Sequence, residues 1–208
     1  MPNNFSLHNA IYTTRSIRKF KPDPIPHDTI RLILEAGTQG PSGKNIQPWR
    51  FIVVQGPKQK KQLARLYSEA FFENRPSEID DPDTNASAYL ARNLDKAPAI
   101  IVVCAPVTQP TGIGQIGPFA STFPAIQNML LTARAHGMGG TITINHVFRH
   151  EDVVERTAVV HLEGVADELG NDRAGASPRP DRPSSRTSLV LKHDLPVQLL
   201  VYKRTFLN

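Results

Sequence analysis

The ten residues from Gly40 to Trp49 constrain the fold of this chain more than any other stretch of its sequence. They read Gly-Pro-Ser-Gly-Lys-Asn-Ile-Gln-Pro-Trp, between a helix-like run that ends at Ala36 and a strand-like run that begins at Phe51. Prolines fix the backbone angle φ, and glycines let a backbone pass close to another surface. The composition therefore predicts a shaped loop whose N–H groups and short polar side chains face a ligand. The alternative is an ordinary turn between a helix and a strand.

Helical and strand-like patterns alternate on both sides of this loop, which predicts an α+β fold. Asp28 or a neighbour is expected to cap the preceding helix, Pro124 to lie in the first turn of the longest helix, and Gly137 to end it. The expected helices cover residues 10–11, 28–36, 57–70 and 121–136, and the expected strands cover residues 50–55, 99–105, 141–145 and 195–202. Residues 73–87 and 109–118 are expected to form loops or flaps.

The length of 208 residues is enough for one domain with a substantial core, although 18 prolines are many for a compact fold. No apolar run is long enough to span a bilayer, and the N-terminus lacks the pattern of a signal peptide. The single cysteine, Cys104, excludes an internal disulfide, and its apolar neighbours predict that it is buried. We therefore expect a soluble cytoplasmic protein without a membrane partner.

The net charge of +5 is compatible with a nucleic-acid partner. However, the basic residues are dispersed, and no zinc-ligand spacing, RNA-binding aromatic signature or basic heptad region accompanies them. We expect no nucleic-acid binding, because an anionic small molecule explains a few local Arg and Lys residues equally well. His146 and His150 are four residues apart, but no third ligand accompanies them, so no metal site is predicted.

Two short clusters outside the loop carry groups suited to a flat, phosphorylated ligand. Arg15 and Arg18 flank Ser16, and this set can bind a phosphate; a solvated basic patch is the alternative. Gly139 and Gly140 lie between an expected helix and an expected strand, where they permit a backbone to lie against a planar ring. A simple helix C-cap explains the glycine pair as well.

The loop itself adds polar groups of a different kind. Asn45 and Gln47 offer amides that can pair with the edge of a heterocycle, and Lys44 offers a cation nearby, whereas Trp49 is expected in the core. No nucleophile–base arrangement, Walker motif or GxGxxG motif is present. If the chain is an enzyme, a bound cofactor is therefore expected to supply the reactivity.

Taken together, the order and spacing of the three clusters resemble the nitroreductase family of FMN-dependent oxidoreductases. The matching pieces are Thr-Arg-Ser-Ile-Arg-Lys-Phe and the proline-rich residues after it (14–26), the loop with its flanks (36–51), and Phe-Pro-Ala-Ile-Gln-Asn-Met-Leu-Leu (123–131) with His-Gly-Met-Gly-Gly at 136–140. The resemblance covers about residues 8–156.

The resemblance implies an α+β sandwich, with a mixed central sheet and flanking helices, that forms a homodimer with FMN at the subunit interface. In that family the arginine segment contacts the flavin phosphate, ribityl chain and pyrimidine edge. The loop lies over the cofactor, often from the other subunit, and the glycine pair approaches the ring and phosphate. The matching positions are Arg15, Ser16, Arg18, Pro41, Ser42, Gly43, Asn45, Gln47, Gly139 and Gly140.

The resemblance also implies a ping-pong mechanism. NAD(P)H reduces the flavin and leaves, and a nitro compound, quinone or similar acceptor then takes two electrons in the same pocket. Arg18 is our first choice, and Lys44 our second, for a cation that tunes the flavin. Solvent is expected to supply protons, because no protein acid or base is obvious. The alternatives are reductive dehalogenation, flavin fragmentation, or a defective or non-catalytic flavin-binding homologue.

The chain departs from the family pattern at two places. Thr14 stands where many members carry another arginine, which predicts a weaker phosphate grip. We assign residues 1–156 to the flavin domain and residues 157–208 to an atypical, irregular and partly disordered tail, because residues 171–188 are rich in Arg, Ser and Pro without pattern. A reading-frame change near Arg156 is one hypothesis for this switch, which translation of the other frames would test.

Overall fold

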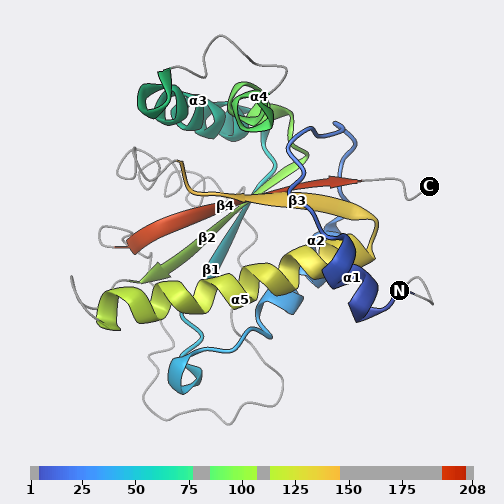
Figure 1. The fold of residues 1–208 in the computed structure, drawn as a ribbon, viewed down its shortest axis with the longest axis vertical. Coiled ribbons are helices and arrows are strands. Elements are labelled where there is room, and N and C mark those ends of the chain that lie inside the picture. Colours follow the sequence, from blue (N-terminus) through green and yellow to red (C-terminus); the bar gives the residue numbers. More distant parts are fainter. Residues whose placement is uncertain (1–4, 77–84, 107–112, 146–193, 205–208) are drawn as a thin grey trace.

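The computed structural model describes residues 5–76, 85–106, 113–145 and 194–204 (Figure 1). Helices cover both faces of one β-sheet, so the predicted α+β class with flanking helices is confirmed. The main elements are α1 (Leu7–Thr13), α2 (His27–Gly37), β1 (Arg50–Val54), α3 (Pro57–Asn74), α4 (Ala86–Asn93), β2 (Ala99–Pro106), α5 (Ile113–Ala135), β3 (Met138–Thr143) and β4 (Asp194–Arg204), with short 3-10 turns η1 (Gly43–Asn45) and η3 (Leu94–Lys96).

Within the described residues the sheet has four strands in the order β1-β2-β4-β3, and every neighbouring pair is antiparallel. A mixed sheet was expected, and the parallel pairing seen in this part of the chain is a single bridge between Ser16 and Gly140 of β3. The predicted strand over 195–202 is confirmed as β4, which lies in the interior of the sheet. The expectations for residues 171–188 lie outside the described residues.

Strand β2 is buried on both faces, as its continuous apolar run predicts. Ile100, Val102 and Cys104 belong to one core cluster, which α3 and α4 cover. Ile101 and Val103 belong to a second cluster, which α2 and α5 cover on the opposite face. The two-residue period of a strand thus lets one short segment join both halves of the core.

Helix α5 differs from its prediction at its start. It begins at Ile113, so residues 113–117 are helical rather than flexible, and both Pro118 and Pro124 lie inside the helix. An internal proline costs a helix about 3 kcal/mol. The buried face that includes Ile126 and Met129 packs in the core and offsets this cost. The expected stop is confirmed, because Gly137 adopts a φ of 71° directly after the helix.

Two further helix predictions were wrong. The helix before the loop starts at His27, its N-cap is Pro26, and Asp28 lies in the first turn, where its charge suits the helix dipole. Helix α4 was missed: its first two residues were assigned to the loop over residues 73–87, and residues 88–93 were assigned to no element. Its signal was Asn85, whose side chain accepts hydrogen bonds from the amides of Ser87 and Ala88. Residues 77–84 lie outside the described residues.

No helix in the described part of the chain combines the length and the apolar character that crossing a membrane requires.

The close approach of the loop to α5 yields a stability prediction. A Cβ at Gly40 would lie 2.8 Å from the backbone nitrogen of Ala125, whereas a Cβ at Gly43 would meet nothing within 4 Å. We expect Gly40→Ala to lower the free energy of unfolding by about 1–3 kcal/mol, because backbone must move. The matched variant Gly43→Ala is expected to leave it unchanged or raise it by about 0.4–1 kcal/mol. Urea denaturation measures both; equal midpoints would contradict the contact.

Candidate functional site

The arginine cluster and the glycine pair meet at the free edge of the sheet. Ser16 forms a parallel bridge with Gly140, and the Ile17 N–H donates to the Gly140 carbonyl at 3.0 Å. We call residues 14–20 the strap, because they cross the edge of β3 from α1 toward α4. The strap pairs with an edge strand whose backbone groups would otherwise be open on that side.

The glycine pair has a different setting from the one predicted. Gly139 and Gly140 lie within β3, opposite Lys203 and Tyr202 of β4, rather than between a helix end and a strand. A Cβ at Gly139 would lie 2.5 Å from Cγ1 of Ile17. Gly139 therefore permits the strap to pack directly on β3, and its assignment to flavin contact stays a prediction.

Arg15 is held at the C-terminal end of α1. Its Nη1 donates to the Tyr12 carbonyl at 2.9 Å and to the Thr14 carbonyl at 2.7 Å. A guanidinium carries five N–H donors, and these two bonds occupy one nitrogen. No hydrogen bond joins its other donors to a residue that the structure describes. Arg15 is thus oriented by the helix end and keeps donors available for an anion.

Arg18 is half-buried, and it has no hydrogen-bond or ion-pair partner among the described residues. Ile17 packs toward Gly139. Successive side chains of an extended segment point to opposite sides, so Ser16 and Arg18 share the side away from Ile17. The strap therefore places a hydroxyl and a guanidinium next to each other, with Arg15 adjacent in sequence.

Thr14 bonds within α1 and does not take the place of the arginine that the family resemblance predicts at this position. Its hydroxyl donates to the Ala10 carbonyl at 2.6 Å, within the last turn of α1. The hydroxyl proton is used there, so Thr14 has no side-chain donor left for a phosphate.

The loop from Gly40 to Trp49 has the shaped backbone that its composition predicts. The backbone angle φ is 52° at Lys44, 54° at Asn45 and 52° at Gln47. Residues other than glycine rarely adopt such positive values. Such strain persists only where the surroundings hold it, and it gathers at functional sites. Ser42 holds the loop closed, because its Oγ accepts the Gln47 N–H at 2.9 Å.

Both ends of the loop are anchored in the core. Trp49 is buried, as predicted, although its Nε1–H has no hydrogen-bond partner among the described residues. The tip is exposed, and Gly43 has open space around it without a positive φ. No described residue is close enough to require a glycine at position 43. A surface from outside the chain, packed closely on the loop, would require one.

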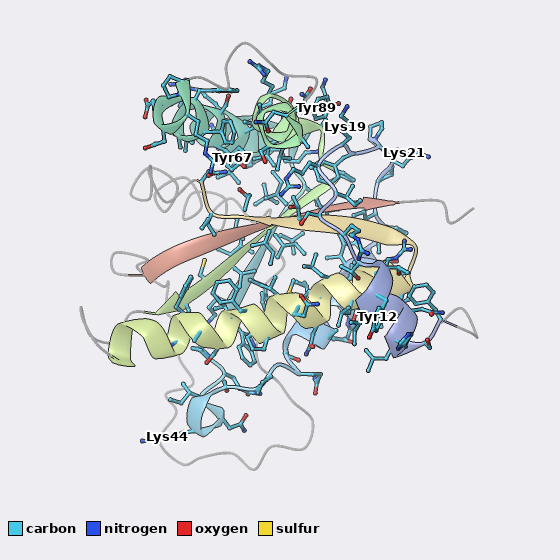
Figure 2. All side chains as sticks on the ribbon, viewed as in Figure 1. Tyr12, Lys19, Lys21, Lys44, Tyr67 and Tyr89 are labelled. Atoms are coloured by element: carbon cyan, nitrogen blue, oxygen red, sulfur yellow. The ribbon has the colours of Figure 1, made fainter. Side chains whose placement is uncertain are left out.

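The loop lies away from the strap within one chain. Gly40 touches α5 at Ala125, whereas Arg134 near the end of α5 donates to the Thr13 hydroxyl of α1 at 2.9 Å. Nine residues of helix separate these points, or about 13 Å. Figure 2 shows Lys44 at the lower left of the molecule, below α5, and Tyr12 on α1 beside the right-hand end of α5. The structure therefore brings two of the three predicted clusters together, and the loop is not among them.

A separate pocket of about 340 Å³ lies between α3 and α4. Arg65 and Glu69 on its wall form an ion pair at 2.8 Å, and the Arg92 guanidinium stacks over the Phe72 ring at 4.7 Å. Lys61 and Asp95 also line the pocket, so its wall carries both positive and negative side chains. It contains none of the predicted site residues.

Lys60 on α3, near this pocket, has a shifted pKa. Its Nζ donates to the Ala97 carbonyl at 2.8 Å. Burial lowers the pKa of Lys60, and the negative charge of Asp95 partly opposes this shift. Lys60 thus anchors α3 to the start of β2.

Among the described residues, no three His, Cys, Asp or Glu side chains are grouped closely enough to hold a metal ion. His146 and His150 lie outside those residues.

Comparison with known proteins decides the family. The model of the nitroreductase family matches residues 11–158 of this chain. The chain belongs to the nitroreductase family. This nitroreductase-family chain is 29% identical over 133 residues to the putative NAD(P)H nitroreductase YfhC of Bacillus subtilis, which covers 64% of the chain and 66% of that relative. It is 43% identical over 68 residues to NADH dehydrogenase of Thermus thermophilus, covering 32% of the chain and only 33% of that relative.

The fold is also that of solved members. The BluB-like flavoprotein of Clostridium difficile 630 superposes with a TM-score of 0.63, covering 99% of this chain and 92% of that one, at 20% sequence identity. At this identity the similarity shows the fold alone. The match of the family model over residues 11–158 confirms the predicted resemblance to the nitroreductase family.

The hydroxyl of Ser42 yields a prediction about the loop. Ser42→Ala removes the acceptor of the Gln47 N–H, a loss of about 1 kcal/mol, so we expect the Gln47 amide to exchange its hydrogen about fivefold faster. Ser16→Ala is the matched control, because its hydroxyl bonds to no described residue. Hydrogen exchange followed by NMR measures both; an unchanged Gln47 rate would show that Ser42 does not hold the loop.

Proposed function

We propose that this chain is an FMN-dependent oxidoreductase that uses NAD(P)H to reduce nitro compounds, quinones or similar acceptors. The observation that carries the proposal is the strap at the edge of β3, where Ser16 and Arg18 share the side away from Ile17 and Arg15, held at the end of α1, keeps donors available. The names of the Bacillus subtilis relative and of the Clostridium difficile flavoprotein support the same class of chemistry.

The chemistry of the strap fits the flavin. The donors of Arg15 left over from capping α1 suit the charge and geometry of a phosphate, and the Ser16 hydroxyl adds one more donor. Arg18, without a partner among the described residues, suits the carbonyl oxygen at the pyrimidine edge. When bound, FMN would supply the redox chemistry, taking two electrons from NAD(P)H and passing two to the acceptor.

The residues of the chain would then bind and orient rather than react. Arg15 would hold the phosphate, and Arg18 would stabilise negative charge at the pyrimidine edge. Asn45, Gln47 and Lys44 carry polar groups on the strained loop, which would cover the cofactor of a second subunit. No acid or base for this role is evident among the residues that the structure describes, so solvent would supply protons.

We further propose that the functional unit is a homodimer. The loop contacts the middle of α5 at Ala125, whereas the end of α1 that leads into the strap contacts Arg134 near the C-terminal end of α5, so one chain alone does not assemble the three clusters. Helix α1, which packs on α5, also exposes a group of apolar side chains: Leu7, Ile11 and Tyr12 are 69%, 51% and 65% exposed. An exposed apolar group of this kind next to the proposed site suits a subunit interface.

Purification and anaerobic reduction test the function directly. A yellow protein that binds FMN and is bleached by NADH or NADPH supports the enzyme. A protein that binds FMN but is not bleached by either nucleotide is a passive binder, and one that cannot be reconstituted with FMN overturns the proposal. Comparison of nitro, quinone and halogenated acceptors then separates nitroreduction from dehalogenation.

The cytoplasmic location stays a prediction.

Arg15 gives a quantitative prediction. Arg15→Ala removes charged hydrogen bonds to the phosphate, so we expect FMN affinity to fall by about 1.5–3 kcal/mol, or about 10–150-fold. Arg65→Ala is the matched control, because Arg65 pairs with Glu69 on α3, away from the strap. Fluorescence titration with FMN measures both. Equal affinity of Arg15→Ala and the unaltered chain would refute the phosphate assignment.

Ile11 tests the dimer. Ile11→Asp places a charge in the exposed apolar group of α1, so we expect the dissociation constant of the dimer to rise at least about tenfold because a buried unpaired charge is costly. Ala86→Asp adds the same charge at the start of α4, where the helix dipole favours it, and should leave association unchanged. Analytical ultracentrifugation measures both; an unaltered dimer in Ile11→Asp would exclude α1 from the interface.

A further inference from the structure

The strap has a second anchor on the opposite face of the sheet. The Lys19 Nζ lies 4.9 Å from the centroid of the Tyr89 ring, within the range of a cation–π contact. Figure 2 shows the two side chains next to each other, one from the strap and one from α4. Lys19 directly follows Arg18, so this contact acts one residue from the guanidinium proposed to meet the flavin.

The Tyr89 ring is a firm support for this contact. Helix α4 is capped by Asn85 at its start, and Ala88, Leu90 and Ala91 on either side of Tyr89 are buried. Phe20, the next residue of the strap, packs against the same core cluster that contains Leu90. The second anchor therefore consists of a cation on a fixed ring and an aromatic side chain beside the core.

Arg18 lies between the two anchors. On one side Ser16 and Ile17 are paired with β3, and on the other Lys19 and Phe20 contact α4 and its core. When both ends of so short an extended segment are held, the backbone angles of the residue between them are restricted. The direction of the Arg18 side chain then depends on both anchors, which is the preorganisation that electrostatic stabilisation requires.

We propose that Lys19 and Tyr89 form a positioning pair that aims Arg18 at the pyrimidine edge of the flavin. This inference rests on the proposed function. Oxidised FMN depends mainly on the phosphate grip of Arg15, whereas reduced FMN carries negative charge at the pyrimidine edge. An Arg18 side chain in another orientation therefore weakens the binding of reduced FMN more than that of oxidised FMN. The ratio of the two affinities thus measures whether Arg18 is correctly oriented.

The experiment measures the dissociation constants of oxidised FMN and of chemically reduced FMN, under anaerobic conditions, for the full chain and a set of variants. Lys19→Met and Tyr89→Leu are each expected to lower the preference for reduced FMN by about threefold, the scale of an exposed cation–π contact. The double variant is expected to lower it no further than either single variant. Lys19→Arg keeps the cation and Tyr89→Phe keeps the ring. Each should therefore have the same preference for reduced FMN as the unaltered chain.

Lys21→Met is the matched charge control, because it removes one positive charge from the segment that follows the strap. It should leave the preference unchanged if Lys19 acts through Tyr89 rather than through its field on the flavin. An equal effect of Lys19→Met and Lys21→Met, or an effect of Lys19→Met without one of Tyr89→Leu, would overturn the pair. Lys19 is exposed, so its variants test the pair even if Tyr89→Leu fails to fold.

A flavin-free measurement gives a second readout. In the chain without FMN, hydrogen exchange of the amides from Ile17 to Phe20 should be about threefold faster in Lys19→Met and Tyr89→Leu, and unchanged in Tyr89→Phe and Lys21→Met. If the unaltered chain binds no FMN, the proposed function and this inference fall together. If it binds FMN and Arg18→Gln lowers the preference for reduced FMN while Lys19→Met and Tyr89→Leu do not, only the positioning pair is wrong.

Discussion

The pairing of β4 between β2 and β3 is the contact on which the rest of this structure depends. Strand β2 is buried on both faces and joins the two core clusters, but β3 reaches it only through β4. Gly139 and Gly140 lie opposite Lys203 and Tyr202, so a segment near the C-terminus holds the strand on which the strap rests. The proposed flavin site thus depends on β4, a strand of the tail that was predicted to lie outside the flavin domain.

The strap turns this sheet edge into a candidate site. An edge strand exposes backbone groups that invite further pairing, and the Ser16–Gly140 bridge with the Ile17 hydrogen bond satisfies part of this edge from within the chain. The same backbone contact places Ser16 and Arg18 away from β3, while the end of α1 orients Arg15. Structural protection and ligand binding therefore use opposite sides of one extended segment.

Elements were predicted correctly where nearby residues determine them, and wrongly where packing against distant parts of the chain does. Strand β2 and helix α3 were placed correctly because apolar runs and the proline at position 57 act within a few residues. The start of α5 was wrong because burial against the sheet outweighs Pro118 and Pro124, and no local pattern reports that burial. Helix α4 was missed although Asn85 is a strong N-cap, because its neighbours read as a polar flap.

By itself the sequence determined the chemistry that is present: an arginine pair around a serine, a proline-bounded loop with polar residues, and a glycine pair in a fixed order along the chain. Local backbone restrictions and the types of donor are properties of residues, so they are readable without a fold. Only the tertiary structure decided which of these groups meet. Ser16 reaches Gly140 through backbone pairing across 124 positions of sequence, while Lys44 lies away from α1, because packing on α5 separates the loop from the strap.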